Sequence, residues 1–317
     1  MALSQGKILI TDSLFIYREH EDLLKNAGFE LVRLDKPSAS EDEIISHLDG
    51  VVGYILGGVE RVTAKVIEAA SSLRAIAFTG SGYHEFIPGL DTATRRGVAV
   101  SAAIGANAPA VAEYALTLTL ALVRRLPELT TVGGSSFMTV KGFKETTVGV
   151  IGMGKIGTLY AELASRVGFR VIAAKNSESD SDRSRLDLRV LLPMSDIVSL
   201  HVSKPRGTGL LGSDEIALLR PGAGIVNTSF SDAINMVAVE DRINDGSLYL
   251  AADGRVAMQK EPKVGHYLAS NAQTAFNTSE CNKNVSDRAT KSILNLLATG
   301  DDADLVNPDY RHFRGQP

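Results

Sequence analysis

Tryptophan is absent from this 317-residue chain, and there is a single cysteine, Cys281. A lone cysteine cannot form an internal disulfide, which is typical of a reducing compartment, so we expect a cytoplasmic protein. Long hydrophobic runs are also missing, because stretches such as Ala115 to Val123 are far too short to cross a bilayer. Residues 1–7 lack the basic and apolar layout of a secretory signal. The sequence therefore predicts no membrane partner.

The chain also has no large excess of charge, since 33 basic and 37 acidic residues give a net charge of −4. This balance does not provide the basic surface that nucleic acids require, so we expect no nucleic-acid partner. The six histidines are scattered, and none lies at ligand spacing from another histidine or from Cys281. The sequence therefore predicts no metal site.

Hydrophobic residues make up 44% of the chain and charged residues 22%, which is ordinary for a soluble globular protein of this length with two cores. The first third alternates short β-rich runs with amphipathic stretches. Strands are expected at 7–11, 30–34, 51–56, 75–79 and 98–101, and helices at 16–27, 41–48 and 63–70. This alternation predicts an α/β fold with a parallel sheet.

A second strand-helix series follows a predicted helix at 110–125 and a Gly-, Ser- and Thr-rich stretch at 126–145, which we expect to be a loop. Its expected strands are 147–151, 170–174, 196–202, 224–228, 248–252 and 267–270. Its expected helices are 156–167, 185–192, 213–219 and 236–244, followed by a long final helix at about 280–298. Both halves of the chain therefore follow the same alternating plan.

The segment Gly152-Met153-Gly154-Lys155-Ile156-Gly157 places a G-x-G-x-x-G motif between an expected strand and an expected helix. In such a turn the first glycine permits a tight bend, the second lets the backbone approach a pyrophosphate, and the third allows close helix–sheet packing. The first turn of the helix adds unpaired N–H groups. The motif predicts a dinucleotide site, although a purely structural glycine turn is the alternative.

Several other motifs occur in the same order as in a known family. With these motifs the chain resembles the D-2-hydroxyacid dehydrogenases over nearly its whole length. The matching stretches are Gly80-Ser81-Gly82-Tyr83, Asn107 to Glu113, Arg124-Arg125, the glycine turn, Asp196 to Val202, Arg220 to Ser229 and Lys260-Glu261-Pro262.

The resemblance implies two Rossmann- or flavodoxin-like domains with parallel sheets. Residues 1–104 and 284–317 would form a substrate (lid) domain, and residues 105–283 would form an inserted dinucleotide-binding domain. The family usually forms homodimers through the cofactor domains, so a homodimer is expected. In the family, the connection that corresponds to the stretch between Arg125 and Val148 helps form the dimer contacts. Here this connection is shorter than in the family and lacks its tryptophan.

The resemblance also implies roles for residues outside the glycine turn. Backbone N–H groups of Gly80, Ser81 and Gly82 would bind the substrate. The other implied cofactor contacts are His201, Val202 and Thr208 beside the adenine ribose, and Thr228, Ser229 and Asp253 at the nicotinamide end.

The strand that follows the glycine helix usually ends in Asp or Glu when the cofactor is NAD, because the carboxylate binds the ribose 2′-hydroxyl. Here the strand at 170–174 is followed by Lys175, Asn176 and Ser177, which offer a cation and two hydrogen-bond donors. This combination favours NADP(H), with NAD(H) as the alternative. An exposed loop lysine without a role would leave the choice open.

The family mechanism uses an Arg to hold the substrate and a His, oriented by a Glu, to transfer a proton. Here Phe230 occupies the Arg position and Gln273 the His position, while Glu261 still matches. Phenylalanine cannot hold a carboxylate by charge-assisted bonds, and glutamine cannot supply a proton near neutral pH. Loss of a general acid-base typically costs on the order of 100- to 10,000-fold in rate.

We therefore predict an NAD(P)-dependent oxidoreductase whose substrate is not a simple 2-keto acid. An iminium, which is already cationic, would accept hydride without a proton donor. A nucleotide-binding homologue without catalysis, acting as a sensor or a complex partner, is the alternative. An adenosyl ligand in the glycine turn is a more remote one.

Overall fold

The computed structural model describes residues 5–11, 16–36, 38–131, 137–175, 182, 184–203 and 209–315. The chain divides into unit 1, Met1–Asn107 with Ser279–Pro317, and unit 2, Ala108–Thr278. Each unit has one sheet with all neighbouring strands parallel, and helices lie on both faces. The predicted fold class is confirmed. No described helix combines the length and the apolar composition needed to cross a bilayer.

The sheet of unit 1 has five strands whose side chains alternate between two cores. Ile8 and Ile10 pack with one cluster of apolar residues, and Leu9 between them packs with another. This alternation is the period of a strand that is buried on both faces. In sheet order the strands are β2 (Glu30–Leu34), β1 (Lys7–Thr11), β3 (Val51–Leu56), β4 (Ala75–Phe78) and β5 (Ala99–Ala102).

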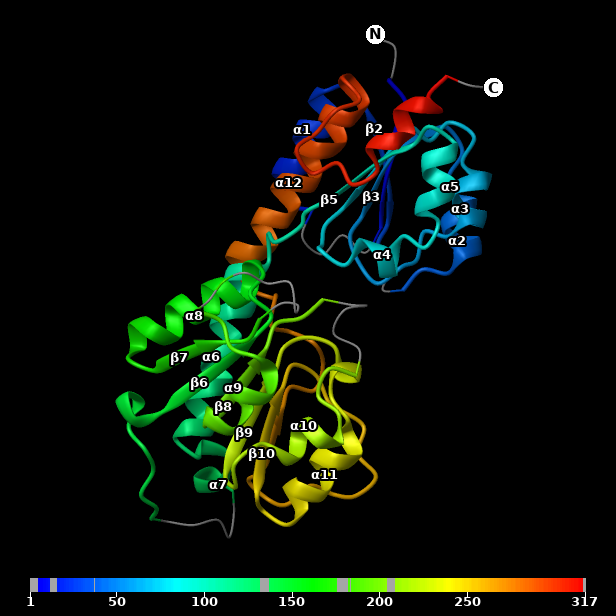
Figure 1. Cartoon of the computed structure of the whole chain (residues 1–317). Helices are drawn as coiled ribbons and strands as arrows, with labels where there is room; N and C mark the ends of the chain where they lie inside the picture. The colour runs from blue at the N-terminus through cyan, green and yellow to red at the C-terminus, as the bar shows by residue number, and fades with distance from the viewer. Residues whose placement is uncertain are drawn as a thin grey trace. The chain divides into compact units, whose positions relative to one another are not determined.

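The helices α1 (Arg18–Asn26) and α12 (Ser279–Ala298) cover one face of this sheet, and the shorter helices cover the other (Figure 1). The shorter helices are α2 (Glu41–Ser46), α3 (Ala64–Ala69), α4 (Tyr83–Phe86) and α5 (Leu90–Arg95). Neither α4 nor α5 was predicted, because each begins after a glycine that offers no side-chain cap, whereas α2 and α3 begin after the capping residues Ser40 and Thr63.

Polar contacts join α1 to α12. The buried His20 lies with its Nε2 2.9 Å from Asp287 Oδ1, and Lys283 Nζ lies 3.0 Å from Glu19 Oε1 and 2.9 Å from Asp287 Oδ1. The ligand atoms of Glu19, His20 and Asp287 are close enough together to hold a metal ion. An ammonium group already lies between the two carboxylates, so the cluster is explained as a link between the helices.

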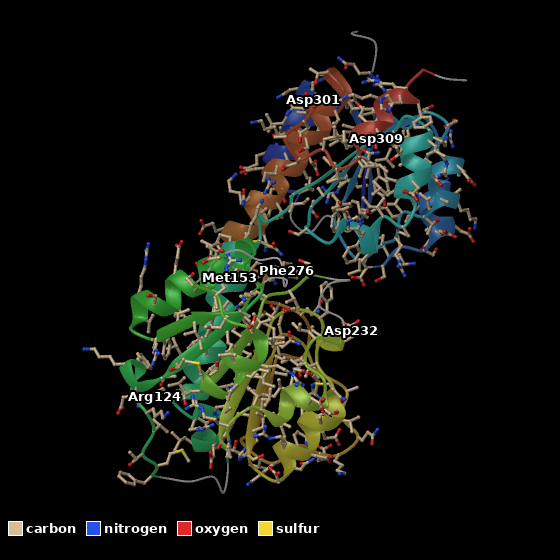
Figure 2. All side chains as sticks on the ribbon, in the orientation of Figure 1. Arg124, Met153, Asp232, Phe276, Asp301 and Asp309 are labelled. Atoms are coloured by element: carbon tan, nitrogen blue, oxygen red, sulfur yellow. The ribbon has the colours of Figure 1, made fainter. Side chains whose placement is uncertain are left out.

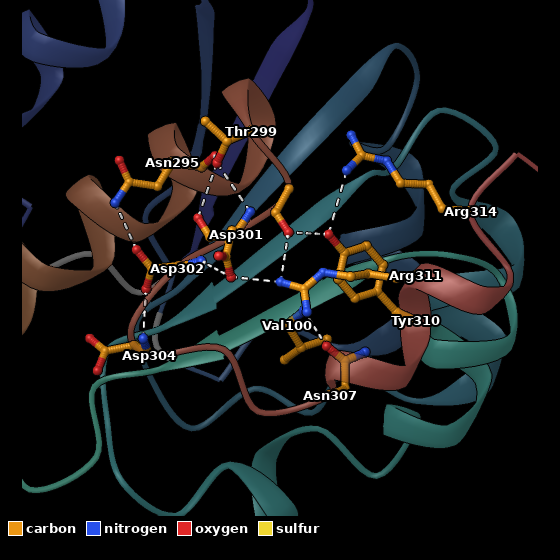
Figure 3. A network of polar contacts seen from close by, with 11 residues as sticks. Val100, Asn295, Thr299, Asp301, Asp302, Asp304, Asn307, Tyr310, Arg311 and Arg314 are labelled. Carbon is orange, nitrogen blue, oxygen red and sulfur yellow. Dashed lines mark hydrogen bonds and ion pairs between the residues drawn. The ribbon is translucent and has the colours of Figure 1, made fainter.

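Within unit 1, a polar network holds the C-terminal tail against α12 and β5 (Figure 3). Asp302 accepts hydrogen bonds from Ser292 Oγ at 2.7 Å and from Asn295 Nδ2 at 2.8 Å. Asn307 is buried, and its Oδ1 accepts from the N–H of Val100 at 2.7 Å. A short helix, η3 (Pro308–His312), ends the described tail.

The sheet of unit 2 has six strands. The helices α6 and α8 pack on one face, and α9, α10 and α11 pack on the other (Figure 1). In sheet order the strands are β11 (Tyr267–Ala269), β10 (Leu248–Ala252), β9 (Ala223–Asn227), β8 (Ile197–Leu200), β6 (Thr147–Ile151) and β7 (Arg170–Ala173). The main helices are α6 (Ala108–Val123), α8 (Lys155–Val167), α9 (Leu188–Met194), α10 (Ser213–Ala217) and α11 (Met236–Asn244).

Two of these helices are followed by a residue in the left-handed conformation. Gly168 follows α8 with φ +109°, a left-handed conformation that favours glycine at the C-terminus of a helix. Arg125 follows α6 with φ +52°, and the short helix α7 (Leu126–Thr130) begins directly after it. The loop prediction for 126–145 is therefore wrong for this part, and η1 (Phe143–Glu145) is a further helical turn in it.

Candidate dinucleotide-binding and active site

Strand β6 lies between β7 and β8, so the strand order of unit 2 reverses at this strand. In open α/β sheets, ligands bind outside the carboxyl ends of the strands at such a reversal. The glycine turn follows β6 at this position, and His201 follows β8. Figure 2 marks the place with Met153, which lies within the glycine turn.

The three glycines of the turn have different steric surroundings. A Cβ on Gly152, whose φ is +95°, would overlap the carbonyl oxygen of His201, and a Cβ on Gly157 would overlap the carbonyl oxygen of Gly152. Apart from its two chain neighbours, a Cβ on Gly154 would have no atom of the described residues within 4 Å. Gly152 and Gly157 are therefore required by packing, whereas Gly154, the residue before α8, faces a space that no described residue fills.

An anion fits this space. The first N–H groups of α8 have no acceptor within the helix, and the positive end of the helix dipole points outward there. The N–H of Gly154 donates to no acceptor in the part of the chain that the structure describes. Backbone donors facing an open space are the arrangement that holds a pyrophosphate.

The backbone of His201 packs against Gly152 of the glycine turn. Its ring is buried 4.7 Å from the ring of Tyr160, and its Nε2 lies 2.9 Å from Ser199 Oγ. Tyr160 continues the polar chain with its hydroxyl 2.7 Å from Thr119 Oγ1. Burial lowers the pKa of His201 to about 3 and raises the pKa of Tyr160 to about 12. Both side chains are therefore uncharged at neutral pH.

The ends of β8 and β9 are tied together by Ser229. Its hydroxyl donates to Leu200 O at 2.9 Å and accepts from the N–H of Val202 at 3.4 Å. Thr228 differs, because its buried Oγ1 has no hydrogen-bond partner among the described residues. A buried polar atom without a partner is costly unless a ligand satisfies it, so Thr228 is available to a bound cofactor.

Lys175 follows β7 at the position expected for cofactor discrimination. Its Nζ lies 3.0 Å from Asp187 Oδ1, and the two side chains are 33% and 69% exposed. Asp187 was not predicted as a site residue, since it lies beyond the predicted strand end on a different element. Asn176, Ser177 and Thr208 lie outside the residues that the structure describes.

Asp253 follows β10 and holds the loop that carries Gln273. Its Oδ1 accepts from the N–H of Thr274 at 2.7 Å and from that of Ala275 at 3.2 Å. A Cβ on Gly254, whose φ is +91°, would lie 3.2 Å from Gln273 Cγ. Gln273 is exposed and lies beside this glycine. Because Asp253 binds the backbone directly after Gln273, its carboxylate fixes this part of the loop.

Glu261 is exposed and lines a hollow of about 610 Å³ together with Arg255, Lys260 and Tyr267. The buried carboxylate of Glu240 fixes the backbone before Glu261. It accepts hydrogen bonds from the N–H of Gln259 at 2.9 Å and also from that of Lys260. Among the described residues, no hydrogen bond joins Glu261 to Gln273. The structure therefore does not assemble the two as an oriented acid-base pair.

Phe230 follows β9 and is partly buried. Its carbonyl oxygen accepts from Asn227 Nδ2 at 3.2 Å and from the N–H of Ala233 at 3.2 Å. Asn227 is itself buried, and its Oδ1 accepts from the N–H of Ser229 at 2.9 Å. The turn is thus rigidly held, but it presents an aromatic ring instead of a guanidinium.

In unit 1 the predicted substrate turn follows β4. Ser81 Oγ donates to Asn107 Oδ1 at 3.1 Å and accepts from the N–H of Gly105 at 2.9 Å, which fixes the turn. The backbone N–H groups of Gly80, Ser81 and Gly82 donate to no acceptor in the described part of the chain. They remain available to a ligand.

Comparison with known proteins identifies the family of this chain. Residues 116–275, about half of the chain, match the family model described as D-isomer specific 2-hydroxyacid dehydrogenase, NAD binding domain. The hydroxypyruvate reductase of Thermotoga maritima is 31% identical over 243 residues, which cover 74% of this chain and 78% of the relative. The chain belongs to the D-isomer specific 2-hydroxyacid dehydrogenase family. The matched residues lie within unit 2, so unit 2 corresponds to the region that the family model describes as the NAD binding domain.

Other members of the family are longer. The D-3-phosphoglycerate dehydrogenase of Synechocystis is 30% identical over 263 residues, which cover 79% of this chain but 46% of the relative. The chain thus spans about half the length of the D-3-phosphoglycerate dehydrogenases that it matches.

Solved structures show the same fold for both units. D-2-hydroxyisocaproate dehydrogenase superposes with a TM-score of 0.82 at 21% identity, covering 95% of this chain and 99% of that one. An acyclic imino acid reductase in complex with NADPH and D-Arg gives a TM-score of 0.81 at 20% identity with the same coverage.

Proposed function

We propose that this chain is an NAD(P)-dependent oxidoreductase that exchanges hydride with a substrate other than a simple 2-keto acid. Unit 2 would be the cofactor domain, predicted at 105–283, and unit 1 the substrate domain, predicted from 1–104 and 284–317. The observation that carries the proposal is the open space at Gly154, between two glycines that packing requires. A nicotinamide dinucleotide bound there would supply or accept the hydride.

The substrate class follows from the replaced residues. Phe230 offers no charge for a carboxylate, and Gln273 offers hydrogen bonds without a transferable proton. An imine that is protonated before it binds accepts hydride without an acid, and Gln273 can orient it through its amide oxygen. Imine reduction is compatible with this fold, since one solved structure with the same fold is named an acyclic imino acid reductase.

The cofactor is proposed to be NADP(H), with NAD(H) as the weaker ligand. The support is Lys175, a cation at the end of β7 where NAD-preferring units have an acid. Its partner Asp187 is exposed, and exposed ion pairs contribute only about 0–1 kcal/mol, so a phosphate can replace the carboxylate.

A cytoplasmic homodimer is proposed for the assembly. One cysteine and no internal disulfide fit a reducing compartment. Leu126, Leu129 and Phe137 are exposed apolar side chains in the stretch that the family resemblance assigns to dimer contacts, with Phe137 88% exposed. Analytical ultracentrifugation of the wild type and of Phe137→Ser tests this, because a dimer formed through this stretch should weaken in the variant.

The cofactor site is tested by Gly154→Val. The Cβ of the new side chain would contact no described residue beyond its chain neighbours, so the melting temperature should stay unchanged. The side chain would, however, fill the space proposed for the pyrophosphate. NADPH affinity, measured by calorimetry, should fall at least about tenfold, which corresponds to about 1.4 kcal/mol of lost binding free energy. Gly142→Val, at an exposed glycine before β6 with φ −73°, is the matched control and should bind normally. Normal binding by Gly154→Val would contradict the proposal.

Catalysis is tested by following nicotinamide absorbance with NADPH and a panel of 2-keto acids and cyclic or acyclic imines. We expect imine reduction with little 2-keto acid reduction. Binding of NADPH without turnover over the whole panel would instead support the non-catalytic alternative, which the unjoined Glu261 and Gln273 would explain.

A further inference from the structure

The end of β7 is paired with the segment that leads into α9. The N–H of Lys175 donates to Leu186 O at 2.9 Å, and the N–H of Leu186 donates to Ala173 O at 2.8 Å. This short parallel contact brings Asp187 beside Lys175, although the two residues belong to different elements. Their ion pair at 3.0 Å is thus positioned by the backbone.

The Asp187 carboxylate is not used for the usual task at its position. Asp187 is the residue before α9, where an aspartate ordinarily accepts a hydrogen bond from the first turn of the helix. Its backbone is extended, with φ −61° and ψ +143°, but its side chain makes no such bond. The carboxylate contacts Lys175 instead.

We infer that Asp187 is a specificity-determining residue that restrains Lys175 and thereby limits the preference for a 2′-phosphorylated dinucleotide. The inference rests on the proposed cofactor site. To bind the 2′-phosphate, Lys175 must leave the carboxylate, and the phosphate must lie near a like charge. A ribose with a free 2′-hydroxyl requires neither change, and the carboxylate remains available to accept its hydrogen bond. Asp187 therefore supplies in space the acid that the end of β7 lacks in sequence.

The test is Asp187→Asn, with dissociation constants for NADPH and NADH measured by calorimetry on the full chain. Asparagine is as good as aspartate before a helix, so α9 should be retained. Freeing Lys175 and removing the like charge should each contribute up to about fivefold. We expect the ratio of NADPH to NADH affinity to rise about tenfold and the gain to shrink at high salt.

Two further variants separate this inference from the proposed function. Lys175→Gln should abolish the NADPH preference, and adding Asp187→Asn to it should change the ratio less than about twofold, because the restrained lysine is gone. Asp214→Asn removes the same charge from an 86% exposed side chain on α10 and should leave the ratio unchanged.

The outcomes differ for each idea. If Lys175→Gln leaves the ratio unchanged, the proposed NADP(H) preference is wrong. If Lys175→Gln lowers the ratio but Asp187→Asn does not raise it, the inference about Asp187 is overturned while the cofactor proposal stands. Equal loss of both cofactors in Asp187→Asn would show a merely structural role and would also overturn the inference.

Discussion

The carboxylate of Asp253 accepts a hydrogen bond of 2.7 Å from the backbone N–H of Thr274, 21 residues further along the chain. The same oxygen also accepts from the N–H of Ala275. Asp253 therefore anchors the loop on which Gln273 lies, whatever contact it makes with a cofactor.

Asp253→Asn should loosen this loop. One carboxylate oxygen becomes an amide donor that faces another donor, which costs about 1–2 kcal/mol of unfolding free energy. Hydrogen exchange of the Thr274 and Ala275 amides should accelerate. Asp245→Asn, at an exposed turn, is the control. Unchanged exchange together with weaker NADPH binding would mean that Asp253 acts on the cofactor alone.

The double substitution Phe230→Arg with Gln273→His should create 2-keto acid reductase activity. It restores a carboxylate clamp and a proton donor in a turn and a loop that the structure already holds by Asn227 and Asp253. We expect kcat/KM for small 2-keto acids to rise by about 100-fold over the wild type, with far smaller effects from each single change. No gain in a variant that still binds NADPH would show that other differences block the reaction.

His201 should make stability depend on pH. Its pKa is about 3 in the folded protein because it is buried, and about 6.5 in an unfolded chain. The unfolded state therefore takes up the proton first as pH falls, so this contribution is present above about pH 6.5 and is lost toward pH 3. The loss is at most about 1.4 kcal/mol per pH unit.

Urea denaturation between pH 7 and pH 4.5 measures this slope. His201→Gln should flatten it, because glutamine does not titrate. His84→Gln, at an exposed histidine of unit 1, should retain the wild-type slope. Equal slopes in all three proteins would assign the pH dependence to other groups.

Asn307→Ala should destabilise unit 1. The side chain is only 6% exposed; besides its bond from Val100, its Nδ2 donates to Thr94 Oγ1 and to Val98 O, each at 3.0 Å. Its loss leaves buried backbone groups without partners, which costs about 2–4 kcal/mol. Calorimetry should show a lower melting temperature, and Asn26→Ala, at the exposed end of α1, should not.

Much of the fold could be predicted because the signals are local. The strand expected at 147–151 is β6, and the helix expected at 156–167 begins one residue earlier as α8. The short helices α4, α5 and α7 were not predicted, since no side-chain cap marks the start of any of them.

The sequence by itself determined the family, the parallel α/β plan and the glycine turn. The α/β plan follows from the periods of strands and helices, which depend on residue type and spacing. The turn follows from its glycines, since Gly152 has a left-handed φ and Gly157 leaves no room for a Cβ. Only the tertiary structure decided which groups face one another. Lys175 lies beside Asp187 across a strand pairing, and Asp253 contacts Thr274 from another element. Among the hydrogen bonds of the described residues, none joins Glu261 to Gln273. Such partners are set by distances through space, which the order of residues along a chain does not contain.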